Sequence, residues 1–352
     1  MRRTLAALVA TCVALGACGG DEDRPGPVTS GGNPVEEAVA LTPPATDQIV
    51  FTHWAALTDD PQEVVDYDGG DLHAELHRRG LAPLVTFDSY LYPDFEELWG
   101  WNADDVEWEA AYSPPDLYVL RFREAIDRAD LEGRLEERGY DETEEGGIAV
   151  FHHAGALDAP WYADAFGPRT PPSVSNMAIV DEKTLMLSTE SERLDAAVEA
   201  LAEREPGNAA MAAAVAALHE PPLFMAFSAD VLCGVHELAR GGSATAREHA
   251  RGLAGHSYEA AAIGLWGPED PRAVVALHYS DAADAEADLE QREAAAAGPS
   301  LVADEPYADV LFNLEGASVD GQDILLEFSP AAGGTLGFAD AVRAGDLTFA
   351  AC

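Results

Sequence analysis

Two histidines of this chain are spaced for metal binding. His73 and His77 lie four residues apart in the polar segment Asp71–Arg79. A helix over this segment would place both imidazoles on one face, at a spacing able to hold a divalent cation. The Glu position of the metalloprotease motif is missing, and no third ligand is evident in the sequence. The alternatives are a metal site at His73 and His77 and a solvated helix face.

Other catalytic arrangements have weaker support in the sequence. Paired carboxylates could serve a glycosidase, but among 64 Asp and Glu residues such pairs arise by chance. The sequence has no Gly-x-Ser-x-Gly elbow, phosphate loop or dinucleotide-binding glycine pattern. Cys233 stands three residues before His236, which would suit a thiol nucleophile only if Cys233 were reduced. No cofactor is expected.

The first eighteen residues have the layout of an export signal. Arg2 and Arg3 precede the uncharged segment Thr4–Leu15, which is too short to span a bilayer. Leu15-Gly16-Ala17-Cys18 resembles the lipobox of bacterial lipoproteins. The resemblance implies cleavage before Cys18, acylation of Cys18 and anchoring at the extracellular face of the cell membrane. The alternative is an ordinary secretory signal with a chance cysteine.

The export signal also indicates a role for each of the four cysteines. Cys12 lies inside the leader and Cys18 is the lipidation candidate, which leaves Cys233 and Cys352. In an oxidising compartment, two cysteines most economically form one disulfide. Closing a loop of that length would contribute at most about 4–5 kcal/mol through chain entropy. The alternative is two free thiols.

The chain is strongly acidic, with 64 acidic and 20 basic residues and a net charge of −44. Nucleic acids and anionic lipid headgroups would be repelled, so both are excluded as partners. A solvated acidic surface, as in high-salt habitats, explains this charge. The sharper alternative is an acidic surface that binds cations or a basic protein partner.

The composition divides the chain into four parts. Residues 1–17 form the signal peptide, and residues 18–45 are rich in Gly, Pro, Ser, Thr and acid. We expect this second part to be a disordered tether, because it cannot bury enough apolar surface to become ordered. Two folded units are expected at residues 46–207 and 208–352.

The pattern of apolar residues predicts alternating strands and helices in both units. In the first unit we expect strands at Val106–Tyr112, Leu117–Phe122, Gly147–His152, Met177–Val180 and Thr184–Ser188, with helices at Asp130–Arg138 and Ser191–Glu203. In the second unit we expect strands at Tyr258–Trp266, Ala273–His278, Val310–Leu314, Ile324–Phe328 and Leu347–Cys352, with helices at Asp281–Ala297 and Thr335–Arg343.

The two units share an order of elements. Val106–Arg138 and Tyr258–Glu293 both consist of a strand, a turn that contains proline, a second strand and an acidic helix. The sequence therefore predicts an α+β fold with antiparallel sheets, helices on one face and two pseudo-repeated ββαββα-like units.

Aromatic residues gather in the first unit, where five of the six tryptophans lie between Trp54 and Trp161. They could stack on sugars, but we favour a place in the core. Together with the lipobox, the stretches Phe51–Ala55, Gly100–Glu109 and Met177–Val180 resemble a group of uncharacterised actinobacterial lipoproteins. That resemblance implies a location and a fold but no activity.

Two hypotheses for the function follow. The first is a membrane-anchored extracytoplasmic lipoprotein that acts as a binding or interaction module. The alternative is a hydrolase of envelope glycans or peptides that uses carboxylates or a metal. A periplasmic-type solute receptor is less favoured, because the alternation of strand and helix typical of parallel sheets is missing from the sequence.

Overall fold

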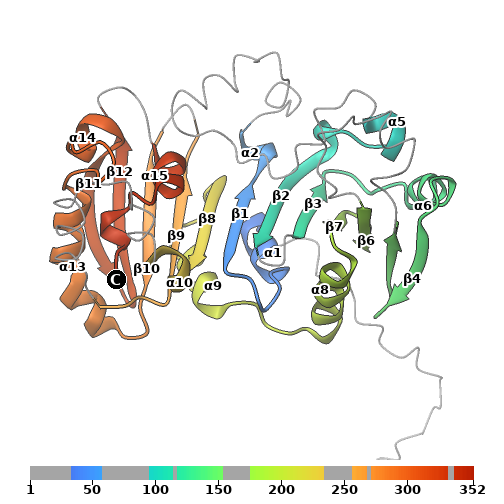
Figure 1. Ribbon diagram of the computed structural model, residues 1–352, viewed down its shortest axis with the longest axis horizontal. Coiled ribbons are helices and arrows are strands. Elements are labelled where there is room, and N and C mark those ends of the chain that lie inside the picture. The colour runs from blue at the N-terminus through green and yellow to red at the C-terminus, as the bar shows by residue number, and fades with distance from the viewer. Residues whose placement is uncertain are drawn as a thin grey trace, which may run out of the picture.

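The fold is built on one large antiparallel sheet, shown in Figure 1, which draws a computed structural model of the chain. The structure describes residues 33–57, 95–113, 117–153, 175–233, 256–267, 271–331 and 337–352. Its twelve strands are ordered β11-β12-β10-β9-β8-β1-β2-β3-β7-β6-β5-β4. All neighbouring strands pair antiparallel. The prediction of antiparallel strands combined with helices is therefore confirmed.

The strands follow the apolar segments of the sequence closely. Their bounds are β1 Gln48–Thr52, β2 Val106–Ser113, β3 Leu117–Phe122, β4 Asp141–Glu145, β5 Ile148–His152, β6 Asn176–Asp181, β7 Thr184–Ser188, β8 Leu223–Ser228, β9 Ala260–Leu265, β10 Ala273–His278, β11 Phe312–Asp320 and β12 Asp323–Pro330. The exceptions are the two edge strands: β4, whose five residues are all polar, and β11, which extends well beyond the expected strand Val310–Leu314 and has one buried residue. Charged side chains on an edge strand discourage pairing with further strands. Because β4 consists of such residues, it has no apolar pattern from which a strand could be predicted.

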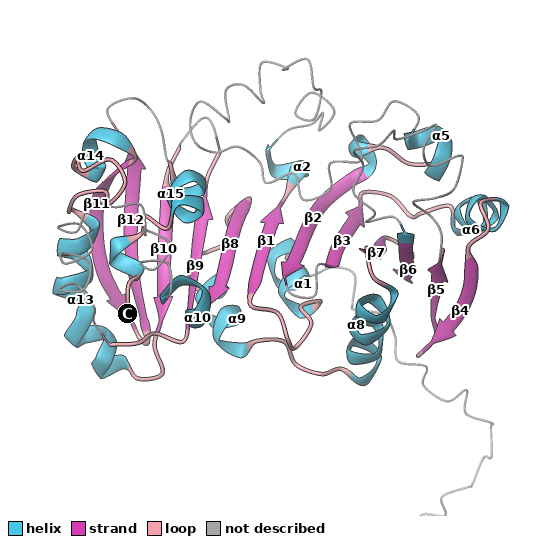
Figure 2. Cartoon of the chain, viewed as in Figure 1, coloured by secondary structure: helices cyan, strands magenta, loops and turns pink. Residues whose placement is uncertain are grey.

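The helices connect strands along the chain and pack against the sheet (Figure 2). Their bounds are α1 Pro34–Ala40, α2 Trp54–Leu57, α5 Phe95–Trp99, α6 Arg128–Glu137, α8 Ser191–Glu203, α9 Ala209–Ala216, α10 Ala229–Cys233, α13 Ala282–Ala296, α14 Tyr307–Val310 and α15 Phe338–Ala344. Short 3-10 turns occur at Ala103–Asp105 and Thr348–Ala350.

Helices cover both faces of the sheet, so the expectation of helices on one face is wrong. In most of the strands, alternate residues enter two separate cores; β4 contributes to neither and β11 only to the first. The first core receives buried residues of α6, α13 and α15, and the second receives those of α1, α8 and α9. All six residues of β9 are buried. A continuous apolar strand of this kind needs cover on both faces.

An N-terminal helix lies inside the segment that we expected to be a disordered tether. The Asn33 side chain accepts a hydrogen bond from the Val35 amide and caps α1, and Pro34 occupies the first turn. The helix is docked on the sheet, because Tyr112 Oη donates to the carbonyl of Ala38 at 2.7 Å. Residues 34–41 therefore belong to the folded part. The composition of the segment did not indicate this, because only a few apolar residues, Val35, Ala38 and Leu41, are buried within a largely polar stretch.

The sheet runs without a break across the expected boundary at residues 207 and 208. β1, from the first unit, pairs with β8, from the second, over five residue pairs from Gln48↔Phe227 to Thr52↔Leu223. The same β1 pairs with β2 on its other side. The two halves thus share one sheet, with the β1–β8 pair at their junction.

Candidate functional site: the C-terminal lock

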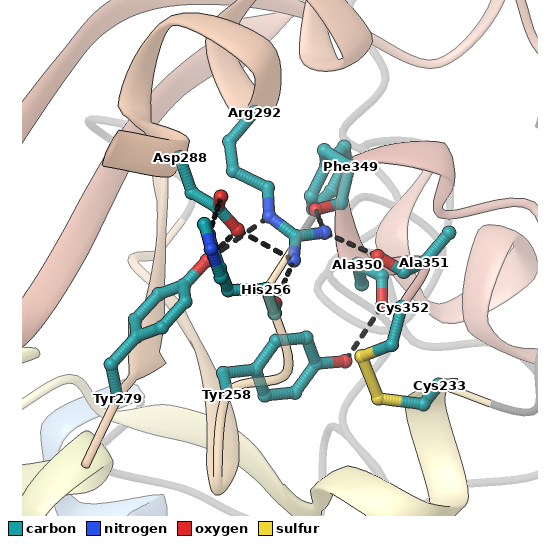
Figure 3. Close-up of polar contacts among 10 residues, drawn as sticks. All are labelled: Cys233, His256, Tyr258, Tyr279, Asp288, Arg292, Phe349, Ala350, Ala351 and Cys352. Atoms are coloured by element: carbon teal, nitrogen blue, oxygen red, sulfur yellow. Dashed lines mark hydrogen bonds and ion pairs between the residues drawn. A yellow bond between two sulfur atoms is a disulfide. The ribbon is translucent and has the colours of Figure 1, made fainter. Parts of the chain in front are cut away.

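Among the residues that the structure describes, a dense network of polar side chains surrounds the last residues of the chain (Figure 3). Its centre is Arg292 of α13, whose side chain is 0% exposed. Asp288, one turn earlier on the same face, is 3% exposed, and its Oδ2 lies 3.4 Å from Arg292 Nη2. A buried guanidinium needs a counter-charge and acceptors for its other N–H groups, and the surrounding segments supply them.

Most of the acceptors are backbone carbonyls. Arg292 donates to the carbonyl of Phe349 at 2.9 Å, to that of His256 at 2.8 Å, and to that of Ala351. Tyr258 Oη donates to the carbonyl of Ala350, between them, at 2.7 Å. Three consecutive carbonyls are therefore satisfied by side chains. The chain end forms a 3-10 turn instead of the expected strand because these side chains replace a neighbouring strand.

The final residue is held covalently as well. Cys352 forms a disulfide with Cys233, the last residue of α10, across a sequence separation of 119 residues. The predicted pairing of these cysteines is confirmed. We call Tyr258, Tyr279, Asp288, Arg292 and this disulfide the C-terminal lock.

A second set of contacts fixes the start of the same segment. The Asp346 carboxylate accepts hydrogen bonds from Ser300 Oγ at 2.5 Å and from the Leu301 amide at 2.6 Å. Tyr307 Oη donates to the Asp346 carbonyl at 2.8 Å. Desolvation raises the pKa of Tyr307, so its hydroxyl stays protonated and able to donate. The end of the chain is thus anchored before and after Phe349, which is 0% exposed.

His256 is the solvent-accessible member of the network. Its Nδ1 lies 2.6 Å from Asp288 Oδ1, and its side chain is 55% exposed. The hydrogen bond to Asp288 and the charge of that carboxylate raise the pKa of His256. Tyr279 Oη donates to the other oxygen of Asp288 at 3.2 Å, and burial raises the pKa of Tyr279 to about 12. The Asp288 carboxylate is therefore shared among three partners.

The pair formed by His256 and Asp288 resembles part of an acid–base catalytic site. A carboxylate that holds Nδ1 of an imidazole orients the ring and leaves Nε2 to exchange protons, as a general base requires. A hydrolase also needs a nucleophile and donors for the developing oxyanion. The groups next to the pair are already engaged, since Arg292 and Tyr258 donate to the carbonyls of the chain end. The arrangement is therefore built to hold a peptide segment in place.

Two further imidazole–carboxylate pairs fasten strands. His278 Nδ1 of β10 lies 2.8 Å from Asp323 Oδ1 of β12, directly opposite it in the sheet. Burial raises the pKa of Asp323, against the opposing influence of His278. His152 Nε2 lies 3.1 Å from Asp195 Oδ1 of α8. Each pair joins neighbouring elements.

The residues predicted from the sequence have mixed outcomes. Cys18, His73 and His77 lie outside the described residues, so the lipidation site and the metal site stay predictions. Four tryptophans are buried, as the core interpretation predicted: Trp54, Trp99, Trp101 and Trp108. Cys233 is oxidised, which removes the thiol that a Cys–His catalytic pair would need.

Within the part of the chain that the structure describes, no group of three or more His, Cys, Asp or Glu side chains is placed to hold a metal ion. None of the described helices is both long and apolar enough to cross a bilayer.

The sequence analysis did not predict the C-terminal lock, although the pattern of residues in α13 could have indicated it. Asp288 and Arg292 stand on the buried stripe of this helix, in line with Ala285 and Ala295. A pair of opposite charges on an apolar stripe at a spacing of four indicates a buried ion pair.

We also compared the chain with known proteins. No protein-family model, curated protein or solved structure matches it significantly, so its function has to be inferred from its own residues.

Proposed function

We propose that this protein is an extracytoplasmic lipoprotein, anchored to the cell membrane through acyl chains on Cys18, whose folded part is an interaction module. The observation that carries the proposal is the disulfide between Cys233 and Cys352. Structural disulfides persist in oxidising compartments and are rare in the reducing cytosol. The export signal ending at Cys18 and the resemblance to actinobacterial lipoproteins support the same location.

We favour an interaction module over an enzyme because the buried polar side chains bind segments of the protein itself. Arg292, Asp288 and Tyr258 bind segments of the chain itself, and the disulfide occupies the two cysteines. The net charge of −44 favours cations or a basic protein as partner and opposes nucleic acid and anionic lipid.

A second candidate function is a carboxylate- or metal-dependent hydrolase of the envelope. The observation that favours it is the exposed imidazole of His256 on the buried carboxylate of Asp288. Metal analysis of the purified protein tests the metal-dependent form. Stoichiometric zinc that is lost in His73→Ala would support it, and a metal-free protein would remove it.

We further propose that the two halves of the sheet are related units. Counted outward from the β1–β8 pair, the first half reads β1, β2, β3, β7, β6 and the second reads β8, β9, β10, β12, β11. In each half a helix follows the third strand, α6 after β3 and α13 after β10. This common order supports the pseudo-repeat, although the first half also carries the extra hairpin of β4 and β5.

Lipidation of Cys18 is tested by metabolic labelling with an alkyne analogue of palmitate. We expect the wild-type chain to be labelled and to sediment with membranes, and Cys18→Ala to lose both properties. Cys12→Ala is the matched control, because it removes the other leader cysteine and should stay labelled. Label that persists in Cys18→Ala, or an unlabelled wild-type chain, would contradict the proposal.

A further inference from the structure

On one side of β11 and β12, none of the helices that the structure describes packs against the sheet. The helical residues of the second core come from α1, α8 and α9, as far as the structure describes the chain. Of these, α9 packs on β8, β9 and β10, whereas α8 packs on β4 to β7. The helices beside β11 and β12, α13 and α14, contribute their buried residues to the first core, on the opposite side. Among the residues that the structure describes, no helix therefore covers the second-core side of β12 and β11.

The side chains on this side are mostly acidic. Across β10, β12 and β11, the register aligns His278 with Asp323 and Asp320, and Val274 with Glu327. Glu315, at the bulge of β11, reaches this side, because it accepts a hydrogen bond from Ser329 Oγ. We call the set Val274, Glu315, Asp320, Asp323, Leu325 and Glu327 the bare face.

The bare face has an apolar centre and an acidic rim. Val274 and Leu325 are half-buried and pack against the edge of the second core, whereas Glu315, Asp320 and Glu327 are exposed. No Lys or Arg occurs in β10, β11 or β12. An apolar centre within a polar rim is the usual anatomy of a protein interface, and this rim carries only negative charge.

The corresponding strands of the first half show what can cover such a face. β7 and β12 are each fourth from the β1–β8 junction, and β6 and β11 are each fifth. On β6 and β7 this side is covered by α8, which inserts Leu194, Ala197 and Val198 into the second core. There the helix meets apolar residues, Ala178 and Met186 among them.

From these observations we infer that the bare face is the docking site for a basic amphipathic helix of a partner protein. The partner segment would lie on the bare face as α8 lies on β6 and β7, and for this reason we expect it to be a helix. The acidic rim fixes its charge, because Arg or Lys beside a short apolar stripe would complement the four carboxylates. The inference deepens the interaction module proposed above and rests on it, but it is independent of Cys18.

The probe is a stapled helical peptide that keeps the apolar positions of α8 and carries Arg at each of its acidic positions. Its binding is measured by fluorescence anisotropy at about 0.15 M salt, where charges more than about 8 Å apart are screened. The protein is the whole chain after the signal sequence, with Cys18→Ser. We expect saturable binding, weakened about fivefold by Asp320→Asn with Glu327→Gln.

The control variant is Glu142→Gln with Glu144→Gln, which removes the same charge from exposed positions of β4. It should leave the affinity within about twofold, since exposed charges away from the contact contribute little. Equal weakening by both variants would mean that the peptide responds to general surface charge. A scrambled peptide of equal charge that binds equally, or the absence of saturable binding, would also overturn the inference.

A labelling experiment checks that the face is open in the isolated protein. Ser318→Cys lies on the exposed side of β11 and Thr143→Cys on exposed β4, so a maleimide should modify both at similar rates. Peptide should slow only the first. A Ser318→Cys thiol that is protected without peptide would show that the chain covers its own face and would exclude an external helix. Lipidation of Cys18 could still succeed in that case, so the two proposals fail separately.

Discussion

Arg292 donates a hydrogen bond to the carbonyl of Phe349, 57 residues further along the chain, at 2.9 Å. The contact joins the C-terminal half of α13 to the buried end of the polypeptide. Because the same guanidinium also binds Asp288, one side chain couples a helix, a carboxylate and the chain terminus.

Replacing Arg292 with Ala should destabilise the protein by about 3–5 kcal/mol, because the buried Asp288 loses its guanidinium partner and the carbonyls of the chain end lose their donor. The measurement is urea unfolding followed by tryptophan fluorescence. Arg128→Ala is the matched control, since the Arg128–Glu132 pair has the same spacing of four but is exposed on α6. It should cost no more than about 1 kcal/mol. Similar losses in both variants would mean that the lock does not depend on Arg292.

Removing the disulfide should also be costly. Cys352→Ser opens a covalent loop that spans 119 residues, and the loss should be about 2–5 kcal/mol in the same unfolding assay. Alkylation of the denatured, non-reduced protein provides a direct check, because neither Cys233 nor Cys352 should react. Two alkylated thiols would show that the pair is not oxidised in the purified protein.

The lock should respond to pH through His256. Its pKa in the folded protein is raised above the ordinary value of 6.5 by Asp288, so the folded state binds the proton more tightly than the unfolded state. The resulting stabilisation is fully present below pH 6.5 and is lost as the pH rises through the folded pKa. His256→Gln should remove this part of the pH dependence. Parallel unfolding profiles of the two proteins from about pH 5 to 9 would contradict the coupling.

Helix α1 should contribute to stability although it lies in the segment that we expected to be a tether. A chain that starts at residue 33 keeps the buried residues Val35, Ala38 and Leu41 and should be as stable as the full mature chain. A chain that starts at residue 42 loses them and should be destabilised by about 3 kcal/mol or more. Thermal unfolding compares the two. Equal melting temperatures would mean that α1 is not docked in solution.

Much of the sheet was predictable because strands are encoded locally. Leu117–Phe122, Thr184–Ser188 and Ala273–His278 have the same bounds in the sequence prediction and in the structure. Their β-branched and aliphatic residues between turn signals leave little choice of conformation. The polar strand β4 escaped because an edge strand is specified by its neighbour β5 and not by apolar residues of its own.

The sequence by itself predicted most of the strands and longer helices, favoured the pairing of Cys233 with Cys352, and favoured burial of the four described tryptophans Trp54, Trp99, Trp101 and Trp108. These depend on local patterns and on the small number of cysteines. Only the tertiary structure decided that helices cover both faces, that Arg292 binds the chain end, and that no described helix covers one side of β12 and β11. The reason is physical: a buried ion pair and a bare face depend on segments far apart in the chain, and no local pattern records which segments meet.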